Sequence, residues 1–142
     1  TLENCYDDWC MSILAKELNK EEDYQYYLKR ALNYQNVFDT ATGFMRPKTA
    51  DGRWIEPFDP IWSGGQGRRE FYTENNGWNY TWYVPHDVEG LIGLMGGREK
   101  FTDKLQTMFE TNVPLYQKYD FLKQYPDMTG WIGMYSHGNE IT

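Results

Sequence analysis

The sequence predicts an all-α fold in which helical hairpins, joined by long loops, form a helical ring or solenoid. Apolar side chains recur at steps of three and four residues in two segments, residues 2–18 and 21–39, which is the spacing of one helix face. The connection between these segments is short, so we expect an antiparallel hairpin. Glycines and prolines then interrupt every period over residues 40–72, which predicts a long loop of the kind that is often functional.

The first two helices have recognisable ends. Glu3 lies near the start of the first helix, and Glu21 to Asp23 crowd the first turn of the second, where acidic side chains favour the positive end of the helix dipole. Asn19 and Lys20 read as a break. The apolar face expected for the first helix consists of Leu2, Tyr6, Trp9 and Ile13, with Leu14 at its edge. That of the second consists of Tyr24, Tyr27, Leu28, Ala31, Tyr34 and Phe38.

Residues 73–84 fit two structures. Trp78 and Trp82 have the i, i+4 spacing of a helix, whereas aromatic residues around a possible Asn76-Gly77 turn fit a β-hairpin. We favour the helix.

The remaining helices are bounded by clearer signals. A short helix that begins at His86 or Asp87 is expected to stop at Gly96-Gly97, because glycine ends helices easily. Residues 98–111 form the next helix. Residues 112–130 are mixed, and the tail after them reads as a loop.

Composition restricts the partners of the protein. The formal net charge of −7 argues against nucleic acid and against an anionic membrane, because phosphate binding requires clustered Lys and Arg. No apolar run approaches the length that spans a membrane. Aromatic residues make up 18% of the chain, more than a core of this size needs. Their rings suit sugar binding as well as packing, and both explanations remain open.

The two cysteines do not form a recognisable site. Cys5 and Cys10 lie five positions apart, so on one helix their side chains point about 140° apart and cannot form a disulfide. A zinc site would require further ligands at suitable spacing. We expect both residues to be small buried apolar side chains.

One carboxylate lies among aromatic residues. Glu74 follows Tyr72 and precedes Trp78 and Trp82. A carboxyl group near apolar rings loses hydration, so its pKa rises, and a general acid needs a raised pKa to keep its proton near neutral pH. The alternative is an exposed glutamate at the start of a helix.

Two further segments concentrate polar groups. In the tail, Asn139 and Glu140 offer the hard oxygen ligands that Ca²⁺ prefers, and His137 can hydrogen bond to a sugar hydroxyl. The alternative is a solvated loop. In the segment Val84 to Asp87, Asp87 can cap a helix, and His86 either contacts a ligand or hydrogen bonds inside the core.

The order of several short strings along the chain resembles a known family. The strings are Thr1 to Trp9 (TLENCYDDW), Thr42 to Arg46 (TGFMR), Tyr72 to Glu74 (YTE), Trp82 to Ile92 (WYVPHDVEGLI), Gly96-Gly97, and His137 to Glu140 (HGNE). Together they cover essentially the whole chain and resemble glycoside hydrolase family 92, the calcium-dependent exo-acting α-mannosidases.

This resemblance implies a fold and an activity. The family's catalytic domain is an (α/α)₆ barrel preceded by a β-sandwich domain, and residues 1–142 would form part of the barrel, without the sandwich. The expected reaction is hydrolysis of terminal α-linked mannose, α-1,2-linked in our prediction, from glycans with inversion. The parent protein is expected in the periplasm or outside the cell. The isolated fragment is expected to be inactive, and to self-associate through exposed barrel faces.

The resemblance also assigns roles to residues. Glu74 corresponds to the general acid, His137 and Glu140 to substrate-binding residues, and Asn139 and Glu140 to calcium ligands. The base aspartate would lie beyond residue 142. Asn75 departs from the family, which usually has glycine after the acid, and this affects the expected substrate preference.

Two other functions remain open. The chain could be a non-catalytic helical carbohydrate-binding module, which would have no need of an acid at Glu74, or an (α/α)₆ glycosidase specific for another sugar, which would not depend on calcium.

Overall fold

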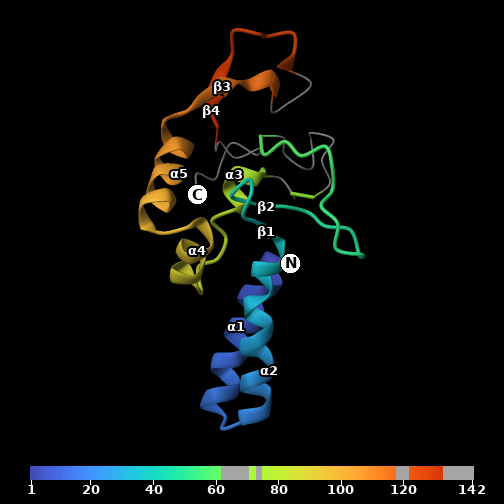
Figure 1. Cartoon of the computed structure of the whole chain (residues 1–142), viewed down its shortest axis with the longest axis vertical. Helices are drawn as coiled ribbons and strands as arrows, with labels where there is room; N and C mark the ends of the chain where they lie inside the picture. Colours follow the sequence, from blue (N-terminus) through green and yellow to red (C-terminus); the bar gives the residue numbers. More distant parts are fainter. Residues whose placement is uncertain (62–70, 73–74, 118–121, 133–142) are drawn as a thin grey trace.

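The computed structural model describes residues 1–61, 71–72, 75–117 and 122–132. Helices make up most of the regular structure, and two short antiparallel strand pairs accompany them (Figure 1). In chain order the elements are α1 (Leu2–Glu17), α2 (Glu21–Ala31), the 3-10 helix η1 (Leu32–Val37), β1 (Phe38–Asp39), β2 (Phe44–Met45), α3 (Gly77–Tyr80), α4 (Val88–Met95), α5 (Arg98–Glu110), β3 (Asn112–Pro114), the 3-10 helix η2 (Leu115–Gln117) and β4 (Thr129–Trp131). The α1–α2 hairpin extends from one end of the molecule, and the β3–β4 pair lies at the other (Figure 1).

The predicted N-terminal hairpin is confirmed. α1 and α2 pack against each other along their length, and the chain reverses at Asn19, whose φ of 55° lies in the left-handed region. The Lys20 amide donates to the Ala15 carbonyl oxygen at 2.8 Å, which satisfies a carbonyl that the end of the helix leaves open.

The buried face of α1 differs from the predicted one. The buried residues are Leu2, Cys5, Asp8, Ser12 and Ala15. Ile13 and Leu14, which the apolar pattern placed inside, are 42% and 51% exposed. The polar members of the face are satisfied within the hairpin: Arg30 of α2 donates to the Asp8 carboxylate at 3.0 Å. Cys5 is buried as predicted, but Cys10 is exposed; neither forms a disulfide.

The second helix is shorter than predicted. α2 ends at Ala31, and the 3-10 helix η1 continues the chain to β1. His86 Nε2 lies 2.9 Å from the Ala31 carbonyl oxygen and so takes up an acceptor at the helix end. Tyr34 of η1 is fully buried and donates its hydroxyl to Asp87 Oδ2 at 2.7 Å.

The helices α4 and α5 agree with the prediction, whereas α3 is shorter. Asp87 caps α4 by accepting a hydrogen bond from the Gly90 amide at 3.0 Å. Gly96 ends α4 with a φ of 90°, and α5 begins after Gly97. Residues 77–80 alone form α3, and Asn76 caps this helix instead of turning a β-hairpin.

The core joins the base of the hairpin to the middle of the chain. Its buried residues are Leu2, Cys5, Tyr34, Phe38, Met45, Val84 and Leu91. They come from α1, η1, both strands of the β1–β2 pair, the segment that leads into α4, and α4 itself, so these parts form one packed unit. On α1 and at the Leu18 cap that follows it, the large apolar side chains Met11, Ile13, Leu14 and Leu18 remain exposed.

The all-α prediction is incomplete at two places. β1 pairs with β2 through Phe38 and Met45, and β3 pairs with β4 through Val113 and Gly130. Both pairs are antiparallel and very short. They connect neighbouring segments of the chain but do not form a β-sheet layer of the fold. No helix among the described residues is long and apolar enough to cross a membrane.

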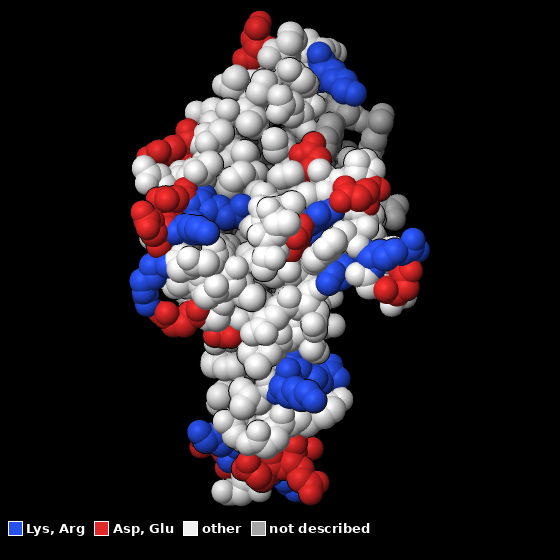
Figure 2. Space-filling model, viewed as in Figure 1, with Lys and Arg blue, Asp and Glu red and all other residues white. Residues whose placement is uncertain are grey.

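The charged side chains on the face drawn in Figure 2 are mixed in sign. Lys and Arg occur in small groups that lie near Asp and Glu, and the described residues of this face offer no continuous basic surface.

Candidate functional site

The site residues that the resemblance assigns fall outside the described residues. Glu74, His137, Asn139 and Glu140 are all in this position. The structure does describe the residues on either side of Glu74, and these define the surroundings of the candidate acid.

Tyr72 holds the chain on the N-terminal side of Glu74. Its side chain is buried, and its hydroxyl donates to the Met45 carbonyl oxygen at 2.6 Å. Burial raises the pKa of the Tyr72 phenol well above its usual range, so the hydroxyl remains protonated and remains a donor. The ring packs against Tyr80, with 5.5 Å between the ring centroids.

Asn76 holds the chain on the C-terminal side. It is fully buried, and its Oδ1 accepts from the Asn79 amide at 3.1 Å, which caps α3. Its Nδ2 donates to the Ile132 carbonyl oxygen at 3.1 Å, so this side chain joins α3 to the end of β4. The next amide, that of Gly77, donates to the Pro60 carbonyl oxygen at 3.0 Å.

Asn75 fits its position without a strained backbone. Asn19 is the one non-glycine residue with a positive φ within the described ranges, so the conformation at Asn75 does not require the glycine that is usual in the family. The Asn75 side chain accepts from the Asn76 amide at 3.0 Å.

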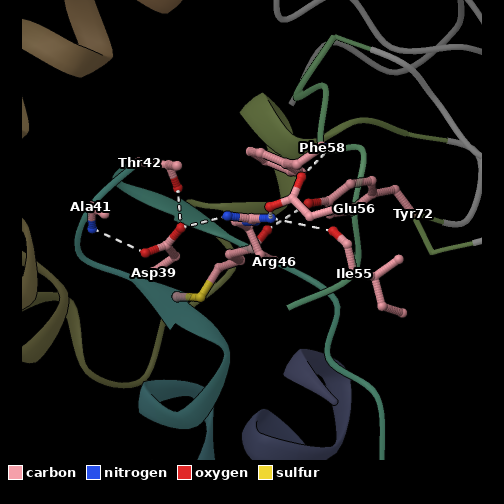
Figure 3. Close-up of polar contacts among 9 residues, drawn as sticks. Asp39, Ala41, Thr42, Arg46, Ile55, Glu56, Phe58 and Tyr72 are labelled. Carbon is pink, nitrogen blue, oxygen red and sulfur yellow. Dashed lines mark hydrogen bonds and ion pairs between the residues drawn. The ribbon is translucent and has the colours of Figure 1, made fainter. Parts of the chain in front are cut away.

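An ion-pair cluster lies beside Tyr72, centred on the buried side chain of Arg46 (Figure 3). The guanidinium donates to Asp39 Oδ2 at 2.8 Å and to Glu56 Oε1 at 2.6 Å. It also lies over the Phe58 ring, with 4.4 Å between the guanidinium carbon and the ring centroid. Arg46 is 6% exposed, so its positive charge has almost no contact with water and is stabilised by these partners instead.

The cluster perturbs the ionisation of Asp39. Burial opposes the charged form of this carboxyl group, but hydrogen bonds from Arg46, the Thr42 hydroxyl and the Ala41 amide outweigh it, and the pKa of Asp39 is lowered. The sequence analysis did not reveal the cluster of Arg46, Asp39 and Glu56, because an ion pair between residues that are separated in the chain leaves no periodic signal.

A cleft of about 480 Å³ opens next to this cluster. Arg46 and Tyr72 contribute to its wall, together with Glu3 from α1 and Phe71. Charged and aromatic side chains therefore border the same hollow, an arrangement that suits a polar ligand with apolar ring faces.

A second hollow, of about 410 Å³, contains a lysine in an aromatic environment. The Lys104 amine lies 3.3 Å from the centroid of the Phe44 ring and 4.6 Å from that of Trp78. Burial lowers the pKa of Lys104 to about 8. The sequence analysis did not identify this residue, although its i, i+3 and i+4 spacing from Phe101 and Met108 places it beside the apolar face of α5.

His86 and Asp87 have structural roles. Asp87 caps α4 and accepts from the Tyr34 hydroxyl, while His86 contacts the Ala31 carbonyl oxygen and packs among the rings of Tyr6 and Trp9. Within the described ranges, no three His, Cys, Asp or Glu side chains are grouped so that they could hold a metal ion.

Comparison with known families identifies the class of protein to which this architecture belongs. A family model described as the glycosyl hydrolase family 92 catalytic domain matches residues 1–142. The chain is therefore part of a glycoside hydrolase catalytic domain, and it belongs to glycoside hydrolase family 92.

Solved structures of two family 92 enzymes from Bacteroides thetaiotaomicron are similar to this chain. An α-mannosidase in complex with mannoimidazole is 38% identical, with a TM-score of 0.78 over 98% of this chain and 18% of that one. An inverting mannosidase is 40% identical, with a TM-score of 0.68 over 76% of this chain and 14% of that one.

A curated relative is found in the fungus Arthroderma benhamiae. It is described as an uncharacterized secreted glycosidase and is 33% identical over 135 residues, which cover 80% of this chain and 17% of the relative. The chain thus spans less than a fifth of the length of each of these relatives.

Proposed function

We propose that the complete protein hydrolyses terminal, non-reducing α-linked mannose of glycans, with α-1,2 linkages as the preferred substrate and inversion at the anomeric carbon. The observation that carries the proposal is the family 92 match over residues 1–142. The solved relatives support it further, since one is described as an α-mannosidase and is bound to mannoimidazole, and another is described as an inverting mannosidase.

The proposed place of the chain is in an (α/α)₆ barrel. The α1–α2 hairpin is one complete helical pair, and the similarity to an α-mannosidase extends over 98% of this chain. Since the chain covers 18% of that enzyme, the β-sandwich and the rest of the barrel would belong to other parts of the complete protein. The secreted relative supports a location in the periplasm or outside the cell.

In the proposed mechanism Glu74 is the general acid. Its protonated carboxyl group donates to the glycosidic oxygen as the bond to the leaving group breaks. A carboxylate from beyond residue 142 would take a proton from water on the opposite face of the sugar. Inverting glycosidases hold these two carboxyl groups roughly 6.5–9.5 Å apart, which leaves room for the water.

The remaining assigned residues would bind sugar and calcium. Asn139 and Glu140 supply amide and carboxylate oxygens, a donor set that fits Ca²⁺. Asn139 and Glu140 would hold the ion, and the chemistry that calcium would supply there is binding and orientation of the sugar hydroxyls, which would favour a distorted ring. His137 and Glu140 would hydrogen bond to the sugar hydroxyls and fix its orientation.

Substitution of the acid tests the assignment. Glu74→Gln keeps the size and shape of the side chain but removes the proton that it donates, so the complete protein should still bind mannosides. Hydrolysis of a mannoside with a poor leaving group should fall by about 10²-fold or more. Unchanged hydrolysis would exclude Glu74 as the acid. Proton NMR of the first-formed mannose tests inversion, since initial release of the α-anomer would contradict it.

A further inference from the structure

We propose that Lys104 is a carbonyl-modification site, at which the side-chain amine condenses with small hydroxyaldehydes to form an imine. The amine borders the hollow of about 410 Å³ that α5 and the β1–β2 turn enclose. This modification does not depend on the proposed hydrolysis of mannosides.

Aromatic rings and the backbone of the turn between β1 and β2 surround the Lys104 amine. Its Nζ lies 3.3 Å from the centroid of the Phe44 ring of β2 and 4.6 Å from that of the Trp78 ring of α3 (Figure 1). A Cβ atom at Gly43 would lie 3.5 Å from the same nitrogen, so the backbone of the turn is also in close contact with it. The half-buried amine is therefore poorly hydrated.

No carboxylate compensates for this loss of water. Among the residues that the structure describes, neither Asp nor Glu forms an ion pair with Lys104. The other charged side chains along the hollow are Lys100 and Asp103, both from α5. The β1–β2 pair and its turn, α3 and α4 contribute residues without a titratable group, namely Phe38, residues 40–43, Trp78, Leu94 and Met95. Burial accordingly lowers the pKa of Lys104 to about 8.

The neutral form of an amine attacks a carbonyl carbon, and the lowered pKa makes this form abundant in Lys104. At about pH 7.4 an amine with a pKa of about 8 is roughly 20% neutral, whereas an ordinary lysine is roughly 0.1% neutral. With a slope like that of thiols, the lower basicity makes each neutral amine about tenfold less nucleophilic. The net advantage of Lys104 is therefore about tenfold or more.

The wall of the hollow also contains hydroxyl groups that can accept hydrogen bonds. Thr42 and Thr107 line it from the turn and from α5. The Thr42 hydroxyl donates to Asp39 Oδ2 at 2.9 Å, and the Thr107 hydroxyl donates to the Asp103 carbonyl oxygen at 2.7 Å. Because both protons are already used, the two oxygens are acceptors for the hydroxyl groups of an incoming hydroxyaldehyde. Trp78 supplies an apolar face for its carbon atoms.

The condensation requires neither an oxidant nor a reductant. The nitrogen lone pair forms a bond to the carbonyl carbon, and the π electrons of the C=O bond move to the oxygen, which takes up a proton lost by the nitrogen. The resulting carbinolamine expels its hydroxyl group, which leaves as water with the second proton of the nitrogen as the C=N bond forms. One water molecule is released for each imine.

Reductive trapping in the complete protein tests the site. The protein is exposed to glyceraldehyde with cyanoborohydride, which reduces the imine to a stable secondary amine, and peptide mass spectrometry follows each lysine over time. Lys100 is the internal reference, because it is exposed and borders the same hollow one turn earlier on α5. At about pH 7.4 we expect Lys104 to be labelled about tenfold faster than Lys100. Comparable rates, or no label on Lys104, would overturn the proposal.

Matched variants show which amine carries the rapid label. Lys104→Arg keeps the positive charge but removes the nucleophilic amine, and Lys100→Arg makes the same change at the exposed lysine. The rapidly labelled fraction should vanish in Lys104→Arg and persist in Lys100→Arg, and the reverse pattern would contradict the assignment. If Lys104→Arg does not fold, the ratio of the two rates in the wild type decides the matter.

Propanal tests the contribution of the threonine hydroxyls. It has as many carbon atoms as glyceraldehyde but no hydroxyl group, so it cannot donate to Thr42 or Thr107. The ratio of Lys104 to Lys100 labelling should be about threefold or more higher with glyceraldehyde than with propanal. An equal ratio would overturn the preference for hydroxyaldehydes.

Discussion

Removal of the Arg46 side chain should destabilise the fold through one buried carboxylate. Arg46→Met keeps much of the aliphatic volume but deletes the guanidinium that pairs with Asp39 and Glu56. The Asp39 side chain is 8% exposed, whereas that of Glu56 is 66% exposed. Water can therefore replace the partner of Glu56 but not that of Asp39, and the cost is expected to come almost entirely from Asp39.

The size of the effect follows from the partners that Asp39 keeps. Removal of one member of a buried ion pair costs about 3–5 kcal/mol. Asp39 retains the Ala41 amide at 3.0 Å and the Thr42 hydroxyl at 2.9 Å, so we expect a value near the lower end, about 3 kcal/mol. In the wild type the lowered pKa of Asp39 contributes stability above its unfolded pKa, and this contribution is lost as pH falls through the folded pKa.

Urea unfolding of wild type and variant tests this value. The difference in unfolding free energy should be largest near neutral pH and should shrink as pH falls through the lowered pKa of Asp39. Arg53→Met is the matched control, since the Arg53 side chain is 80% exposed in its pair with Asp51, and it should change stability by about 0.5 kcal/mol or less. The reasoning is refuted if Arg46→Met costs no more than Arg53→Met, or if its cost does not depend on pH.

Two further predictions concern α4 and α5. Gly90→Ala should destabilise the protein by about 1–3 kcal/mol, because the new methyl group would overlap the Asp87 carboxylate and the Tyr34 hydroxyl. Gly93→Ala, in open space on the same helix, should stabilise it by about 0.5–1 kcal/mol, and equal effects in urea unfolding would contradict the packing described here. Because burial lowers the pKa of Lys104 from 10.5 to about 8, the unfolded state binds more protons between these values, and stability should rise with pH across that window. Lys104→Met should flatten this rise and increase the free energy of unfolding by about 1–2 kcal/mol below pH 8, after allowance for the lost ring contacts. An unchanged dependence of stability on pH, measured by thermal melts, would contradict this prediction.

The helix ends that depend only on neighbouring residues in the sequence were predicted correctly. The stop at Gly96-Gly97, the cap at Asp87 and the turn at Asn19 each depend on a few neighbouring residues, and the structure places all three as expected. The second helix was predicted too long because its end depends on distant contacts. His86 and Asp87 meet Ala31 and η1 across more than fifty residues of sequence.

The buried face of α1 shows a second reason for error. An apolar pattern counts Asp8 and Ser12 as surface residues, yet the structure buries both, because Arg30 and the Trp9 carbonyl oxygen satisfy them. The partner of Asp8 belongs to α2, so no property of α1 alone predicts the burial of this carboxylate. Because the buried face of α1 is not the one that the apolar pattern predicted, several apolar residues of this helix are exposed.

The candidate site was likewise predictable from the sequence only in part. The Tyr-Thr-Glu string led to Glu74 through its resemblance to a family, and the family itself is confirmed. The described residues near it in the chain, Tyr72 and Asn76, make buried hydrogen bonds to Met45 and Ile132, which lie far apart from them in the sequence. Such contacts have no spacing that a single sequence reveals.

The measurement that tests the central claim most directly is mannose release by the complete protein. The substrate is α-1,2-linked mannobiose, assayed once with calcium and once with a chelator. The account predicts release with calcium and its loss with the chelator. Release that the chelator does not affect would contradict the calcium site, and no release in either condition from a folded protein would contradict the proposed α-mannosidase activity.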